Sequence, residues 1–173
     1  MKRVFFLVVF LFLGVEVLMA QQINRVIVDP TLHREVLTGL CNRKGLETGL
    51  FSTWFNSQYK NYHPDTNILK QLAPEINRVQ FTVVFGSWCG DSKREMGRFF
   101  KVLDDAGYHG HPKIIAVQRT LKAGDVDISD LNIHRIPTFI VDYQGKEIGR
   151  IVESPKTSIE ADLLSILNKT KDK

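Results

Sequence analysis

The chain has 173 residues and carries 23 Lys and Arg against 19 Asp and Glu, a formal net charge of +4. This length is enough for one domain with a sizeable core, and two cysteines are too few for a small fold held together by disulfides. The weak basic excess contains no basic run interleaved with aromatic residues, so no nucleic-acid partner is indicated.

The N-terminus has the pattern of a secretory signal peptide. Two basic residues precede an apolar run from Val4 to Val15, and the small Ala20 offers a cleavage site. An uncleaved membrane anchor is the alternative, but the run is shorter than the roughly 20 apolar residues that a span needs, and Glu16 interrupts it. Residues 1–20 are therefore predicted to be removed on export, which leaves no membrane association.

Residues 21–78 are predicted to form a mainly helical extension that packs on the rest of the domain. Val26 to Val28 favour a strand, and residues 35–41 fit a helix or a strand equally.

Two helices are expected within this extension. Asn42 is a suitable N-cap for the first and Asp65 for the second, and Pro74 is expected to end the second. The first helix has a broad apolar face made by Leu46, Leu50, Phe51, Trp54, Phe55 and Tyr59. Such a face is most simply explained by core packing.

Residues 79–170 alternate between strand and helix patterns and are predicted to form an α/β domain. The expected strands are residues 80–86, 113–118, 136–142 and 147–152. The expected helices are residues 90–106 and 155–169, with a short helix or turn at 127–133. Thr157 and Glu160 have the spacing of a capping box at the start of the last helix. The first three strands fit a parallel arrangement and the fourth an antiparallel hairpin, which predicts a mixed sheet with helices on both faces.

The segment Trp88-Cys89-Gly90-Asp91-Ser92 lies where a buried strand is expected to end and a helix to begin. Helix N-termini present unpaired N–H groups and a partial positive charge, which favour an anion. A cysteine in this position is expected to be partly thiolate, the reactive form of the side chain. A small buried hydrophobic residue is the alternative for Cys89, and the helix start favours the reactive thiol.

The sequence Trp-Cys-Gly at residues 88–90, together with Ile136-Pro137-Thr138, resembles the thioredoxin superfamily over roughly residues 80–168. The resemblance implies that the Ile136–Pro137 bond is cis and lies opposite Cys89. It also implies that the Ile136 backbone pairs with an extended substrate. The implied substrate groove is formed by Trp88, Gly90, Asp91, Ile136 and Thr138. The sequence is similar to bacterial thioredoxin-like proteins with a Trp-Cys-Gly-Asp motif, which implies that the exported chain is periplasmic.

The chain departs from the dithiol pattern of this superfamily. Ser92 replaces the second cysteine of the Cys-x-x-Cys motif, so a mixed disulfide at Cys89 must be resolved by another thiol. Cys41 is a candidate for that thiol, provided that the two alpha carbons come within about 7 Å; a core position is the alternative. Asp91 disfavours the thiolate through its charge, or it suits the first turn of the helix. Two further departures are Val83, in place of a buried aspartate, and Gly97, in place of a proline.

These features predict an exported monothiol protein that exchanges disulfides, with Cys89, Ser92 and Pro137 as its catalytic residues. It needs no organic cofactor or metal, and its partners are protein thiols or disulfides and an upstream reductant. A non-catalytic thioredoxin-fold module that binds periplasmic proteins in the same groove is the alternative. A cluster-binding role like that of monothiol glutaredoxins is a third hypothesis, which export disfavours. His109 and His111 have a spacing that suits a metal, but a surface turn is the simpler interpretation because no third ligand is visible.

Overall fold

The computed structural model describes residues 22–169, and the predicted signal peptide lies outside the described residues. The strands are β1 Val26–Asp29, β2 Arg34–Leu37, β3 Gly39–Cys41, β4 Gln80–Phe85, β5 Lys113–Ala116, β6 Thr138–Tyr143 and β7 Lys146–Val152. The α-helices are α1 Arg43–Glu47, α2 Ser52–Asn61, α3 Thr66–Ile76, α4 Gly90–Asp105 and α5 Ile159–Asn168, and the 3-10 helices are η1 Gly49–Phe51 and η2 Ser129–Leu131. In this part of the chain, no helix has both the length and the apolar character needed to cross a membrane.

The central sheet has five strands in the order β3-β5-β4-β6-β7. β4 is parallel to β5 and antiparallel to β6, while β3 and β7 are antiparallel edge strands. β1 and β2 form a separate antiparallel hairpin. This mixed α/β architecture confirms the predicted fold class and is consistent with a thioredoxin-like fold.

The prediction that the first three strands of the domain are parallel is wrong, because β6 is antiparallel to β4. β5 ends beside Phe85, the last residue of β4, and β6 begins with Thr138 beside Val84. The connection between β5 and β6 therefore starts and finishes at the same end of the sheet, which requires the chain to reverse.

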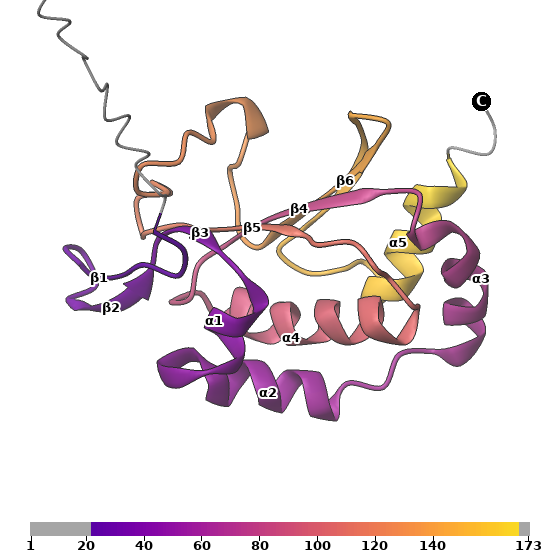
Figure 1. Ribbon diagram of the computed structural model, residues 1–173, viewed down its shortest axis with the longest axis horizontal. Helices are drawn as coiled ribbons and strands as arrows, with labels where there is room; N and C mark the ends of the chain where they lie inside the picture. Colours follow the sequence, from indigo (N-terminus) through magenta and orange to yellow (C-terminus); the bar gives the residue numbers. More distant parts are fainter. Residues whose placement is uncertain (1–21, 170–173) are drawn as a thin grey trace, which may run out of the picture.

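The two faces of the sheet are covered unequally. The α-helices pack on one face, where α4 lies under the sheet and α2 lies under α4 (Figure 1). Buried rings fill this layer; the centroids of Phe99 and Phe81 are 5.4 Å apart, and those of Phe99 and Phe139 are 4.8 Å apart. The other face is covered by residues 117–136, which contain η2 and enclose a smaller core around Ile115. Of the helices expected on both faces, the α-helices of the described residues thus lie on one face and a 3-10 turn lies on the other.

Gly97 allows α2 to approach α4 closely. A Cβ at this position would lie 2.5 Å from the carbonyl oxygen of Phe55 and 2.8 Å from the amide nitrogen of Tyr59. Only a residue without a side chain fits there, so the backbones of the two helices meet at this point. Gly97 thus serves the close packing of α2 against α4.

The region before residue 79 contains a hairpin and a strand as well as helices. The segment that fitted a helix or a strand forms β2 and β3. Thr38 separates the two strands, and Gly39, the first residue of β3, has a φ of +81°. β3 pairs with β5, so this region contributes an edge strand to the central sheet. The extension is therefore built into the fold as well as packed on it.

The helices of this region differ in part from those predicted. Asn42 and Asp65 are N-caps, as predicted; their side chains accept hydrogen bonds from backbone amides of α1 and α3. The single helix expected across residues 46–59 is instead α1, η1 and α2, because Thr48 is extended and Gly49 has a φ of +63°. Pro74 lies inside α3 and does not end it; burial of Ile76 on the same face accounts for the last helical residues.

The predicted capping box at the last helix is wrong. Ser158 is the N-cap of α5, and its hydroxyl accepts from the Ala161 amide at 3.3 Å. Glu160 faces inward instead, where its carboxylate accepts from the hydroxyl of Tyr62 (2.8 Å) and the amide of Asp65 (3.1 Å). The Glu160 side chain thereby links α5 to the connection between α2 and α3.

Candidate functional site

Cys89 is the N-cap residue of α4 and follows the short loop after β4. Its amide donates to the carbonyl oxygen of Gly86 (2.9 Å), and its carbonyl oxygen accepts from the Lys93 amide (3.0 Å). The thiol is half-buried, and its weak S–H donor faces the carbonyl oxygen of Ile136, 3.6 Å from Sγ. The sulfur is therefore held at the open end of a helix, and not deep in the core.

The Ile136–Pro137 peptide bond is cis and lies beside Cys89, in agreement with the resemblance. The Thr138 hydroxyl donates to the carbonyl oxygen three residues before it (2.7 Å), and the Glu153 amide donates to the carbonyl oxygen of Pro137 (2.7 Å). Thr138 is buried, so its side chain supports the bend from inside. These bonds fix the bend at the end of the sheet from which α4 begins.

Trp88 is held by two segments that are remote in sequence. Its indole N–H donates to the carbonyl oxygen of Val117 (2.9 Å), and its own carbonyl oxygen accepts from the Arg34 guanidinium (3.1 Å). The Arg119 guanidinium lies over the indole ring, 4.8 Å from its centroid, in a cation–π contact. The ring next to Cys89 is therefore fixed by β2 and by the chain that follows β5.

The space around the sulfur is closely packed at Gly86, after β4, and unoccupied at Gly90, where α4 begins. A Cβ at Gly86 would lie 2.6 Å from the Ile136 side chain and 2.8 Å from the Trp88 ring. A Cβ at Gly90 would meet no atom within 4 Å. A second chain can therefore approach Cys89 over Gly90.

Ser92 is fully buried, and its hydroxyl oxygen accepts from the Gly86 amide at 3.1 Å. This bond ties the first turn of α4 to the end of β4. The described residues show no hydrogen bond between Ser92 and Cys89, so a catalytic role for Ser92 stays a prediction. A hydroxyl cannot form a disulfide, and the contact that the Ser92 hydroxyl makes is a structural one.

The Asp91 carboxylate is paired with an arginine. It accepts from Arg94 at 2.7 Å, and Arg94 also binds Glu95 and donates to the Ser154 hydroxyl (2.7 Å). Asp91 lies in the first turn of α4, where a negative charge suits the helix. Its charge is thus partly balanced by Arg94, which reduces its effect on the neighbouring sulfur.

Cys41 lies in β3 and is 8% exposed. Burial raises the pKa of its thiol to about 12, which keeps it protonated and unreactive at neutral pH. It belongs to the main core, whereas Cys89 packs against the smaller core of the opposite face, and both cysteines are free. The structure places Cys41 as a core residue and does not bring it to Cys89.

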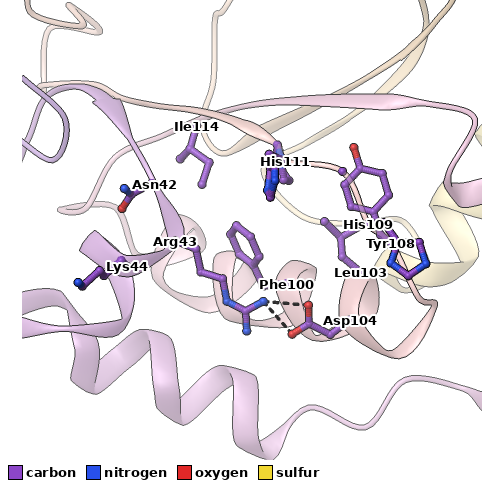
Figure 2. A pocket seen from close by; sticks show the side chains of 12 residues that line it. Asn42, Arg43, Lys44, Phe100, Leu103, Asp104, Tyr108, His109, His111 and Ile114 are labelled. Carbon is purple, nitrogen blue, oxygen red and sulfur yellow. Dashed lines mark hydrogen bonds and ion pairs between the residues drawn. The ribbon is translucent and has the colours of Figure 1, made fainter. Parts of the chain in front are cut away.

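A separate pocket of about 490 Å³ lies at the other end of α4 (Figure 2). Arg43 and Asp104 face each other there in an ion pair of 2.8 Å that joins α1 to α4. His109 and His111 line this pocket, and residues 22–169 contain no group of three His, Cys, Asp or Glu side chains placed to hold a metal. The pocket shares no residue with the surroundings of Cys89.

Arg34 and Arg119, which hold Trp88, were not predicted from the sequence. Neither belongs to a motif, because each reaches the site through long-range contacts. The Asp29 carboxylate accepts from the Arg119 amide (2.9 Å), and the Ser87 hydroxyl accepts from the Leu37 amide (2.9 Å). The one local signal for these contacts was Asp29, at the end of the strand expected at residues 26–28. Its side chain is buried in the structure.

These observations define a mixed α/β protein with one half-buried cysteine at a helix start, beside a cis-proline. No protein-family model matches the chain, and no curated protein matches it. Among solved structures, it is similar to a protein of unknown function, PA1234, from Pseudomonas aeruginosa, with a TM-score of 0.51 and 16% identity over 68% of this chain and 81% of that chain.

Two further solved structures align with the chain. An HIV epitope scaffold has a TM-score of 0.50 and 17% identity, over 67% of this chain and 81% of that chain. A mutant thioredoxin from Halobacterium salinarum has a TM-score of 0.36 and 13% identity, over 62% of this chain and 85% of that chain. Likeness at these identities concerns the fold alone, so the function has to be argued from the site.

Proposed function

We propose that this chain is an exported, periplasmic thioredoxin-like protein that carries out monothiol thiol–disulfide exchange through Cys89. The observation that supports this most directly is the position of the sulfur. It lies at the N-terminus of α4, 3.6 Å from the carbonyl oxygen of Ile136 and next to the open space over Gly90. This position leaves the sulfur beside the cis-proline bend, where a substrate disulfide can reach it.

The first step is an attack by the Cys89 thiolate on one sulfur of a substrate disulfide. A bond forms between Cys89 Sγ and that sulfur, the substrate S–S bond breaks, and its electron pair leaves with the second sulfur as a thiolate. That thiolate takes a proton from solvent. The product is a mixed disulfide at Cys89, and the substrate backbone lies along Ile136 and Pro137.

The second step needs a thiol from outside the chain, because Ser92 cannot supply one and Cys41 lies in the core. A low-molecular-weight thiol or a reduced partner protein attacks the substrate sulfur of the mixed disulfide. Cys89 leaves as a thiolate, and the incoming thiol remains joined to the substrate. The two steps exchange one disulfide for another without net oxidation or reduction.

A non-catalytic module that binds exported proteins in the same groove is the second candidate. The observation that favours it is the buried Ser92 in place of a resolving cysteine. The two candidates differ in whether Cys89 is needed to hold a partner.

The test is the reaction of the reduced native protein with dithiodipyridine, an uncharged disulfide whose thiopyridone product is followed by absorbance. We expect one equivalent to be released from the native protein and a second after denaturation. Cys41→Ala should retain the native equivalent, and Cys89→Ser should lose it. No release from the native protein, or release that depends on Cys41, contradicts the proposal.

A capture experiment separates the two candidates. Periplasmic extract is passed over immobilised protein, and bound proteins are eluted first with salt and then with dithiothreitol. Exchange predicts partners that elute only with dithiothreitol and are absent with Cys89→Ser. Partners retained by Cys89→Ser and eluted by salt favour the binding module instead. N-terminal sequencing of the secreted protein tests export and is expected to start at Gln21.

A further inference from the structure

A pocket of about 320 Å³ adjoins Trp88 on the side formed by the N-terminal region. Its apolar walls are Trp54, Trp88 and Leu50, and Leu50 is 61% exposed. This volume is within the range of about 300–1,000 Å³ that is common for binding pockets. Trp88 and Cys89 are neighbours in the sequence and pack against the same small core. The pocket therefore lies beside the thiol.

A second pocket of about 470 Å³ lies next to the first, since Glu35, Leu50 and Phe51 line both. It extends to Val26 of β1, which is 45% exposed. We call the two pockets together the hairpin groove. The groove therefore runs from Trp88 past Leu50 to Val26 of β1.

The charges of the hairpin groove are unbalanced. Arg34 and Lys93 line the pocket at Trp88, and Lys44 lines the second pocket. Within residues 22–169, none of these three cations forms an ion pair with a carboxylate. Glu35 is the acidic residue that both pockets share. The groove combines exposed apolar side chains with an excess of unpaired positive charge, which complements an acidic, partly apolar partner.

We propose that the hairpin groove binds an acidic, extended segment of the substrate protein, next to the substrate's reacting cysteine. An apolar side chain of that segment enters the pocket between Trp54 and Trp88, and neighbouring carboxylates pair with Arg34 and Lys93. This inference rests on the proposed exchange at Cys89 and gives it a substrate class. The groove, which is formed largely by the N-terminal region, then selects the substrate, and the thiol reacts with it.

The test uses short peptides in which one cysteine carries a thiopyridyl group as a mixed disulfide. The first peptide has Glu-Leu-Glu beside the cysteine, the second Lys-Leu-Lys and the third Glu-Ser-Glu. The rate of thiopyridone release by the reduced native protein is measured for each peptide and divided by the rate with dithiodipyridine. We expect the first peptide to react about tenfold faster than the second at low salt, with a smaller difference at high salt. We also expect it to react faster than the third.

Substitutions in the groove test whether its residues cause the preference for the acidic, leucine-containing peptide. Lys93→Glu should reduce the ratio between the first and second peptides to near one, and a glutamate suits its place in the first turn of α4. Lys146→Glu makes the same charge change at the turn between β6 and β7 and should keep the ratio. Trp54→Ala and Leu50→Ser should remove the preference for leucine over serine, and the exposed Leu50 can be changed without loss of core packing.

Each outcome bears on one proposal. If dithiodipyridine does not react with the native protein, the exchange at Cys89 fails. If it reacts but the peptides react equally, or the ratio survives Lys93→Glu, the groove proposal alone is overturned. A stable dimer that Leu50→Ser dissociates would also overturn it, because the groove would then hold a second copy of the chain.

Discussion

Gly97→Ala tests whether close backbone contact between α2 and α4 holds the N-terminal region in place. The added Cβ would lie 2.5 Å from the carbonyl oxygen of Phe55, 2.8 Å from the amide nitrogen of Tyr59 and 2.8 Å from the Cβ of Gln58. Two of these atoms belong to the backbone of α2 and cannot rotate away. The helix itself must move to relieve the overlap.

The expected cost follows from two opposing effects. Overpacking a well-packed core costs about 1–3 kcal/mol, and contacts with backbone atoms place Gly97 at the upper end. Alanine stabilises a helix interior by about 1 kcal/mol relative to glycine. The free energy of unfolding should therefore fall by about 2 kcal/mol, the difference between these terms.

The assay is urea denaturation of the mature chain, followed by circular dichroism. With an m-value of about 2 kcal/mol per molar, the midpoint should fall by roughly 1 M, and m should not change. Gly90→Ala is the matched control in the same helix, because its Cβ would meet no atom within 4 Å. It should change the stability by less than about 0.5 kcal/mol. A Gly97→Ala variant as stable as the wild type, or a Gly90→Ala variant equally destabilised, would refute the reasoning.

Two further predictions concern pH. Hydrogen bonds from the amides of Arg119, Leu32 and Thr31 lower the pKa of Asp29 below its ordinary 3.8. Its stabilising contribution is thus present above that pH and lost as the pH falls through the lower folded pKa. Asp29→Asn should therefore lower the urea midpoint at neutral pH, by an amount that shrinks as the pH falls below 3.8; a difference that does not shrink on acidification would contradict this. Burial raises the pKa of Cys41 from 9.0 to about 12, so wild-type stability should fall between those two pH values, by up to about 4 kcal/mol. Cys41→Ala should show a smaller fall, because burial raises the pKa of tyrosines such as Tyr62 in both proteins but only the wild type has the buried thiol; parallel pH curves for the two proteins would show that the thiol is not buried in solution.

The parts of the fold that were predictable are those in which a local pattern and burial agree. In α4, the helix expected over residues 90–106, the apolar residues Met96, Phe99 and Phe100 are all buried, because their three- and four-residue spacing places them on one face. The caps at Asn42 and Asp65 were predictable because a cap depends on a side chain and the amides two or three residues later.

The features of the fold that were predicted wrongly or left open depend on the tertiary structure. The direction of β6 follows from the course of residues 117–137 over the sheet, which has no local signal. β3 has three residues, and its pairing with β5 determines that it is a strand. The inward position of Glu160 follows from its bonds to Tyr62 and Asp65, which no spacing within α5 encodes.

In the site, too, residues in local motifs were predictable and residues placed by tertiary contacts were not. Cys89 and Pro137 stand in short motifs, so their positions at a helix start and in a cis bend were predictable with the help of the resemblance. Arg34 and Arg119 could not be found in this way, because Trp88 meets both only in the folded chain. The core position of Cys41 was also left open by the sequence, since the pattern around it allowed a helix or a strand.

The contacts that hold Trp88 also form the hairpin groove. The Leu37 amide donates to Ser87 across 50 residues of sequence, and Arg34 donates to the carbonyl oxygen of Trp88 across 54. Both bonds join β2 to the loop that carries Cys89, and Arg34 lines the groove as well. A change in the hairpin should therefore alter the surroundings of the thiol without touching it. These two hydrogen bonds thus join the N-terminal region and the loop before Cys89 into one unit, so the proposed groove and the proposed exchange at Cys89 both depend on them.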